Sequence, residues 1–240
     1  MFRFYFIITF SVFTALFFIG ATKVIMHNPE RFSENQKYGL VKYICWHISF
    51  KGRIKNIYSG IENLPEDGGY IMYPNHQGRY DAVGIILGHE KPCSIVIDSI
   101  RSHVLILDQV TDLLDGKRLD KSDAKNQVQN ILQVAKEVSE GRRYILFPEG
   151  GYEDDVSDNT IKEFMPGSFK AAMKAKCPIV PVALVDSYKA FYKNSIRKIT
   201  CQTHFLEPIY YEEYKDMNSH EISDLVKSRI ESKINEVLAM

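Results

Sequence analysis

The sequence predicts an α/β protein: a mixed, mostly parallel sheet covered by helices, with an amino-terminal helical segment that associates with a membrane. Three observations lead to this class. From residue 53 onward, short apolar or β-branched segments alternate with segments of helical periodicity. Polar loops follow two of the expected strands, as is typical of open α/β sheets. An uncharged apolar run lies near the start of the chain. We expect a membrane anchor and interfacial helical segment at 1–51 and an α/β domain at 52–240.

The apolar run from Phe4 to Thr22 covers 19 residues without a formal charge. As one helix it would be about 28 Å long, close to the roughly 30 Å of a bilayer core. A cleaved signal peptide and a buried core helix are the alternatives. Lysine and arginine are more numerous after the run than before it. This bias favours a cell-membrane protein whose catalytic domain faces the cytoplasm.

A second amino-terminal stretch, Tyr38 to Phe50, combines apolar and aromatic residues with lysines. Trp46 and the two tyrosines suit the headgroup region of a bilayer, and the lysines suit anionic lipid. The alternative is an ordinary helix that packs on the domain, and the sequence does not decide between the two.

Seven strands and several helices are expected in the α/β part. The strands are short, apolar or β-branched, and bounded by Gly, Pro or charge. Their ranges are Ile54–Tyr58, Tyr70–Tyr73, Cys93–Ile97, Lys117–Leu119, Arg143–Phe147, Ile179–Val185 and Thr200–Leu206. Helices are expected at Ala82–Leu87, Asp123–Glu140 (with Ser122 as its cap), Ser168–Lys176 and Glu221–Leu238. The apolar stripes of the last three predict core faces that cover a mostly buried sheet.

Composition disfavours several functions. The chain has 30 basic and 30 acidic side chains, so no bulk charge attracts nucleic acid. None of the four cysteines forms a C-x-x-C pair, which favours reduced core thiols in a cytosol-facing domain over a disulfide or metal role. The histidines lack tight metal-ligand spacing, so we expect no metal.

The most informative stretch runs from Asn75 to Asp81. It forms a loop between an apolar strand that ends at Pro74 and an apolar helix. If the loop turns at Gly78, Asp81 can accept a hydrogen bond from one imidazole nitrogen of His76 and fix its tautomer. The other nitrogen can then take a proton from an attacking hydroxyl, a contribution of roughly 10²–10⁴-fold. In the alternative interpretation, Asp81 is a helix N-cap and His76 an ordinary loop residue.

Two further polar stretches are candidates for substrate binding. Glu149 and Gly150 lie in a Pro-Glu-Gly-Gly turn, where glycines allow positive φ and expose backbone N–H groups to an anion. Arg118 and Lys121 lie just before a helix and suit a phosphate group. The alternatives are a plain turn with an exposed glutamate and a solvated charged turn.

In this order and spacing, these stretches resemble the glycerolipid acyltransferase family that includes the PlsC-like lysophosphatidic acid acyltransferases. The family's N-H-x4-D block is matched by Asn75, His76 and Asp81, and its F-P-E-G block by Phe147 to Gly150. Three weaker matches are Leu119-Asp120-Lys121, with lysine in place of arginine, Phe164-Met165-Pro166-Gly167, and the strand Ile179–Ala183 with its central proline. The resemblance covers about residues 53 to 208.

The resemblance implies an enzyme that moves a fatty acyl group from acyl-CoA or acyl carrier protein to the free hydroxyl of a lysophospholipid, preferably lysophosphatidic acid, to give phosphatidic acid. His76 would be the base and Asp81 its orienting partner. The substrate-binding residues would be Asn75, Arg79, Arg118, Lys121, Glu149 and Gly150. No metal or redox cofactor is implied.

One departure from the family pattern concerns the residues after F-P-E-G. The family continues Thr-Arg-Ser, whereas this chain continues Gly-Tyr-Glu from residue 151 and then has two aspartates. The expected phosphate-binding arginine is missing, and Arg79, Arg118 or Arg142 could substitute. Another lyso-acceptor therefore stays an alternative. So do a thioesterase-type hydrolase that uses the same pair with water, and a non-catalytic lipid-binding protein.

Overall fold

The computed structural model describes residues 2–102, 106–151, 158–191 and 195–239. Within these ranges, seven strands form one sheet in the order β1-β7-β6-β2-β5-β3-β4. All neighbouring strands are parallel except β6 and β7. The strands are β1 Ile54–Ser59, β2 Ile71–Pro74, β3 Ser94–Asp98, β4 Lys117–Leu119, β5 Tyr144–Ile145, β6 Ile179–Val185 and β7 Ile199–Phe205. The predicted mixed, mostly parallel sheet is confirmed.

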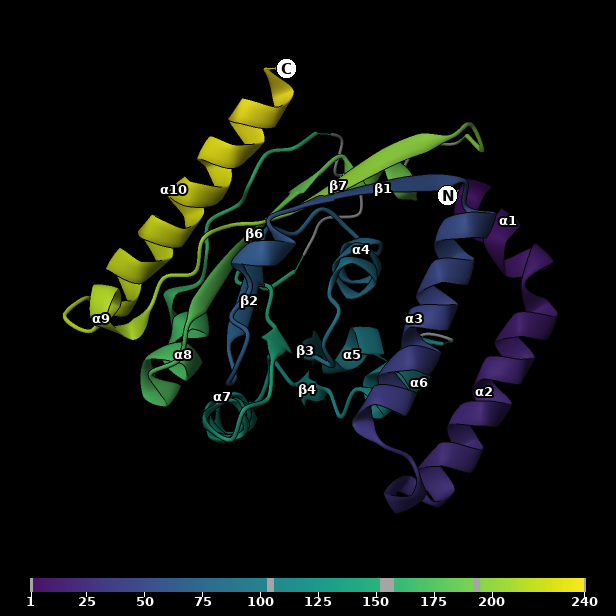
Figure 1. Ribbon diagram of the computed structural model, residues 1–240, viewed down its shortest axis with the longest axis horizontal. Helices are drawn as coiled ribbons and strands as arrows, with labels where there is room; N and C mark the ends of the chain where they lie inside the picture. Colours follow the sequence, from purple (N-terminus) through teal and green to yellow (C-terminus); the bar gives the residue numbers. More distant parts are fainter. Residues whose placement is uncertain (1, 103–105, 152–157, 192–194, 240) are drawn as a thin grey trace.

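Helices cover both faces of this sheet (Figure 1). The α-helices are α1 Phe2–Phe10, α2 Val12–His27, α3 Glu34–Lys51, α4 Asp81–Gly88, α5 Ser99–Ser102, α6 Leu107–Leu113, α7 Ala124–Ser139, α8 Lys170–Ala175, α9 Tyr211–Tyr214 and α10 Ser219–Leu238. Short 3-10 turns cover Pro29–Arg31, Ile61–Asn63, Pro166–Phe169 and Ser187–Ala190. One core cluster joins α7, α8 and α10 to the sheet, and a second joins α2, α3, α4 and α6 to its other face.

The predicted helices are present, with small differences at their ends. The cap of α7 is Asp123 and not Ser122, because the Asp123 carboxylate accepts the N–H groups of Lys125 and Asn126. The strand expected over Arg143–Phe147 is short, since only two of its five residues pair as β5. The remainder turns toward the loop that carries Glu149.

The amino-terminal apolar run is bent. Instead of one helix over Phe4–Thr22 it forms α1 and α2, which meet at 70°. Ser11 lies at the break, and its hydroxyl lies 3.0 Å from Nε2 of His47 on α3, so the break is held against the domain. No single helix in the described ranges is long and apolar enough to cross a bilayer, whereas this bent pair has the length and composition for it.

The second aromatic stretch is α3, and it has two faces. Tyr38, Val41 and Ile44 are buried against the domain. Trp46 and Phe50 are 52% and 63% exposed and stack on each other. The helix thus packs on the domain and still presents aromatic rings to its surroundings.

Candidate active site

The carboxyl ends of β2 and β5 lie side by side because the two strands pair in parallel. The loop after β2 carries His76 and Asp81, and the turn after β5 carries Glu149. The backbone N–H of His76 donates to Oε1 of Glu149 over 2.8 Å, across 73 positions of sequence. Parallel pairing thus brings two of the predicted motifs together at one edge of the sheet, where ligands of open α/β sheets bind.

His76 and Asp81 are in direct contact. Nδ1 of His76 lies 2.7 Å from Oδ2 of Asp81, whose side chain is buried. That oxygen also accepts the N–H groups of Gln77 and Gly78, and Oδ1 accepts the hydroxyl of Ser187. With four donors around it, the carboxylate has one orientation and holds the ring in one tautomer. Asp81 is not the N-cap of α4, because Tyr80 occupies that position.

The His76 ring is also held from the side. It stacks on Phe147 of the F-P-E-G turn, with ring centroids 4.1 Å apart and planes 25° apart. Its side chain is 12% exposed, so part of the ring reaches the surface. Because Nδ1–H donates to Asp81, Nε2 is the basic nitrogen of the ring. This arrangement suits proton transfer from a bound hydroxyl.

Glu149 lies beside the pair in a desolvated position. Burial raises the pKa of Glu149 to about 8, and the neighbouring charge of Asp81 acts in the same direction. The N–H groups of His76 and Lys162 oppose this rise. Gly150 follows with φ of +70°, a backbone conformation that favours glycine. A Cβ there would lie 2.8 Å from the sulfur of Met165, so this side chain would have to move to admit a larger residue.

Asn75 was expected to contact substrate, but its amide is bonded elsewhere. Nδ2 donates to the carbonyl of Leu184 over 3.1 Å, and Oδ1 accepts the N–H of Leu184 over 2.7 Å. The side chain is fully buried. The amide therefore ties the loop after β2 to strand β6, and we infer that Asn75 positions the loop.

Three residues that support the pair were not singled out from the sequence. Gln77 accepts the N–H of Ser187 and donates to Asn159, while Ser187 donates to Asp81. Asn159 in turn accepts the N–H of Asp186. Gln77 lies inside the N-H-x4-D block, so its position in the sequence could have identified it. Ser187 and Asn159 had no local signal, because they lie 106 and 82 positions from their partners.

The predicted basic residues differ in their surroundings. Arg118 bonds to Asp108 and Asp112, each over 2.7 Å. The ammonium of Lys121 contacts Asp98 over 2.7 Å and the carbonyl of Gly150 over 2.5 Å, so it lies at the edge that carries Glu149.

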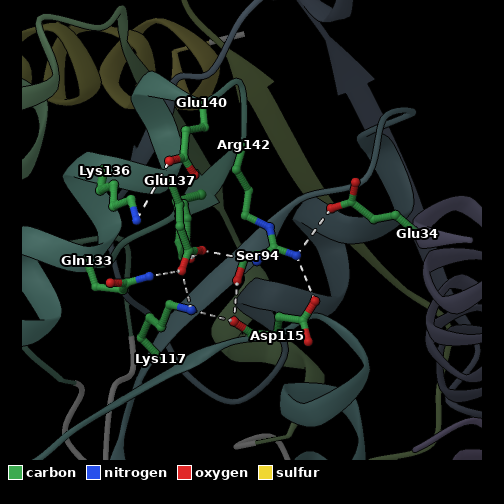
Figure 2. A network of polar contacts seen from close by, with 10 residues as sticks. Glu34, Ser94, Asp115, Lys117, Gln133, Lys136, Glu137, Glu140 and Arg142 are labelled. Atoms are coloured by element: carbon green, nitrogen blue, oxygen red, sulfur yellow. Dashed lines mark hydrogen bonds and ion pairs between the residues drawn. The ribbon is translucent and has the colours of Figure 1, made fainter. Parts of the chain in front are cut away.

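Arg142 and Arg79 lie in different places. Arg142 precedes β5 and therefore lies at the amino end of this strand, away from the loops that carry His76 and Glu149. There it joins a network around Glu137 and Asp115 (Figure 2). It is therefore not a substitute for the missing phosphate-binding arginine. Arg79 is exposed, with its guanidinium over the ring of Phe4 at 5.4 Å. The acidic continuation at 152–157 lies outside the described residues.

Comparison with known proteins identifies the family to which this chain belongs. The family model described as "Acyltransferase" matches residues 55–185, more than half of the chain. The 1-acyl-sn-glycerol-3-phosphate acyltransferase alpha of Ovis aries is 26% identical, over 85% of this chain and 70% of its own length. The 1-acyl-sn-glycerol-3-phosphate acyltransferase of Saccharomyces cerevisiae is 30% identical, over 53% of this chain and 42% of its own.

A solved structure shares the fold. The 1-acyl-sn-glycerophosphate (LPA) acyltransferase PlsC from Thermotoga maritima superposes with a TM-score of 0.77 at 19% sequence identity. The match covers 99% of this chain and 94% of that chain. The two chains thus share the same overall fold.

Proposed function

The chain belongs to the acyltransferase family, and we propose that it transfers a fatty acyl group from a thioester donor to the free hydroxyl of lysophosphatidic acid, giving phosphatidic acid for phospholipid synthesis. The names of the relatives support this acceptor. The donor is acyl-CoA or the thioester of acyl carrier protein. Acyl transfer involves no change of oxidation state and the acceptor supplies the nucleophile, so the proposal includes no metal or redox cofactor.

The proposed mechanism depends on the contact between His76 and Asp81. Nε2 of His76 removes the proton of the acceptor hydroxyl as its oxygen attacks the thioester carbonyl. The new O–C bond forms, the C–S bond breaks, and the imidazolium returns the proton to the leaving thiolate. Asp81 stabilises the transient imidazolium, while its four donors prevent it from turning away.

The acceptor is proposed to bind along the edge formed by Glu149, Gly150 and Lys121. Within the described ranges Arg79 has no carboxylate partner, and it is exposed three residues from His76. We therefore assign the acceptor phosphate to Arg79, with Lys121 nearby. Arg118 already forms ion pairs with two aspartates, so we propose that it attracts the acceptor phosphate without binding it directly.

The enzyme is proposed to work at the surface of the cell membrane with its catalytic domain in the cytoplasm. Support comes from the exposed aromatic side chains of α1, α2 and α3, among them Phe10, Phe13, Phe17, Trp46 and Phe50. Each of these five rings is more than half exposed, whereas large apolar side chains of a soluble domain are mostly buried. Rings of this kind insert into the headgroup region of a bilayer.

The test offers the purified protein a panel of lysolipids with acyl-CoA and with acylated carrier protein, and identifies the products by mass. His76→Ala and Asp81→Ala should each abolish transfer, while His220→Ala, which removes an exposed imidazole on α10, should not. Full activity in both site variants contradicts the mechanism. Donor cleavage without a lyso-acceptor indicates a thioesterase, and lipid binding without turnover indicates a non-catalytic protein.

A further inference from the structure

A groove of about 510 Å³ runs between α7 and α8. Val128 and Leu132 line it from α7, and they are 56% and 43% exposed. They lie four residues apart, on one side of a helix whose core stripe is formed by other residues. Lys170 and Lys174 line the opposite wall from α8. The surface is therefore an apolar strip bordered by cations.

The lysines around this groove are not neutralised. Lys170 and Lys174, which line the groove, and Lys125, which follows the lining residue Ala124, are exposed, and none of the three pairs with a carboxylate in the described part of the chain. By contrast, Lys117 and Lys121, which precede α7, both form ion pairs over 2.7 Å. In a protein of zero formal net charge, this local excess favours an acidic partner.

The groove begins at the active-site edge of the sheet. The start of α7 follows Lys121, whose ammonium contacts the Gly150 carbonyl. Gly167, on the other wall, follows Met165, whose N–H donates to the carbonyl of Pro148 over 2.8 Å. Both walls are therefore tied to the F-P-E-G turn. A partner seated here lies next to the turn that contacts His76.

The groove is also accessible to a soluble protein when the enzyme is bound to a membrane. Its helices, α7 and α8, pack on one face of the sheet, while α2 and α3 lie on the other (Figure 1). If the exposed aromatic rings of α2 and α3 contact lipid, the α7–α8 face is turned toward the solvent. This placement argues against a lipid chain as the occupant.

We propose that the α7–α8 groove docks an acidic carrier protein that brings the acyl group as a thioester on a flexible arm. An apolar side chain of the carrier would lie between Val128 and Leu132, and its carboxylates would meet Lys125, Lys170 and Lys174. The proposal rests on the proposed function and assigns its donor. Charge pairs of this kind chiefly set encounter rate and orientation, and they weaken with salt.

The experiment compares two donors on the same enzyme. Lys170→Glu with Lys174→Glu reverses both charges on α8. Lys55→Glu, which reverses one exposed, unpaired lysine of the described chain on the edge strand β1, is a single-charge control. Transfer to lysophosphatidic acid is measured with palmitoyl carrier protein and with palmitoyl-CoA, in vesicles of constant composition. We expect the KM for the carrier thioester to rise about tenfold or more in the double variant, with kcat and the palmitoyl-CoA kinetics unchanged. The control should match wild type with both donors.

The outcomes separate this inference from the proposed function. An unchanged KM for the carrier thioester, or an equal loss with both donors, overturns the docking site. Wild-type transfer from palmitoyl-CoA but not from the carrier thioester also overturns it, while acyl transfer itself stands. Transfer from neither donor to any lysolipid of the panel rejects the proposed function and the docking site together.

Discussion

The guanidinium of Arg3 donates a hydrogen bond to the carbonyl of Ala190 over 2.9 Å, although 187 positions separate the two residues. It also bonds to the carbonyl of Lys189, and its side chain is fully buried. Both carbonyls belong to the turn Ser187–Ala190, whose first residue donates its hydroxyl to Asp81. The first turn of the amino-terminal helix and the carboxylate that orients His76 therefore share one support.

Replacement of Arg3 by alanine should weaken both the fold and catalysis. The variant loses three hydrogen bonds from a charged donor and leaves their carbonyls unsatisfied. We expect the free energy of unfolding to fall by about 2–4 kcal/mol, measured by urea denaturation. We also expect kcat to fall more than KM rises, because Ser187 no longer holds Asp81 in place. Arg3→Lys should recover part of kcat, and Lys23→Ala, an exposed charge on α2, should change neither quantity. An Arg3→Ala enzyme with wild-type kcat would show that the shared turn has no catalytic role.

Glu149→Gln should make the protein more stable in alkaline solution. The pKa of this carboxyl in the folded state, about 8, exceeds its unfolded value, so the folded state binds the extra proton between about pH 4.5 and 8. The contribution of Glu149 to stability is therefore largest at low pH and is lost as pH rises through this window. Urea denaturation should show the two proteins alike near pH 5 and the variant more stable at pH 8.5. A difference that is constant with pH would contradict this.

Glu137→Gln should destabilise the protein at neutral pH and much less in acid. Burial alone would raise the pKa of Glu137, but hydrogen bonds from Lys117, Tyr144, Gln133 and Arg142 outweigh it and lower the pKa to about 2 (Figure 2). This stabilisation is present above the unfolded pKa of about 4.5 and is lost as pH falls toward 2. We expect a loss of about 2 kcal/mol at pH 7, measured by urea denaturation. Glu140→Gln, at an exposed ion pair of 3.9 Å, is the control and should change stability little at either pH.

Removal of the aromatic pair on α3 should weaken membrane binding. Trp46 and Phe50 are exposed and stacked, so their replacement by serine removes apolar surface without opening the core. We expect the double variant to sediment with anionic vesicles at least about tenfold less well. Leu238→Ser, which removes an exposed apolar side chain on α10, serves as the comparison. Equal sedimentation of all three proteins would mean that this face does not touch lipid.

Much of the fold was predictable because its signals are local. The ranges of β6 and β4 were expected to the residue, since alternation of apolar segments with turns depends only on neighbouring residues. The bend at Ser11 between α1 and α2 was not predicted, because hydropathy measures how apolar a segment is and not where its helix bends. The break is stabilised by His47, a residue of another helix.

By itself, the sequence determined which chemical groups the site could use: an imidazole in the loop after a strand, a carboxylate five positions later at the start of a helix, and a glutamate in a glycine turn after another strand. Only the tertiary structure decided what each group touches. It hydrogen-bonds Ser187 to Asp81 and Leu184 to Asn75, and it pairs Arg118 with two aspartates. The reason is physical: buried polar groups need hydrogen-bond partners, and folding supplies them from segments as far as 187 positions away, which no local pattern encodes.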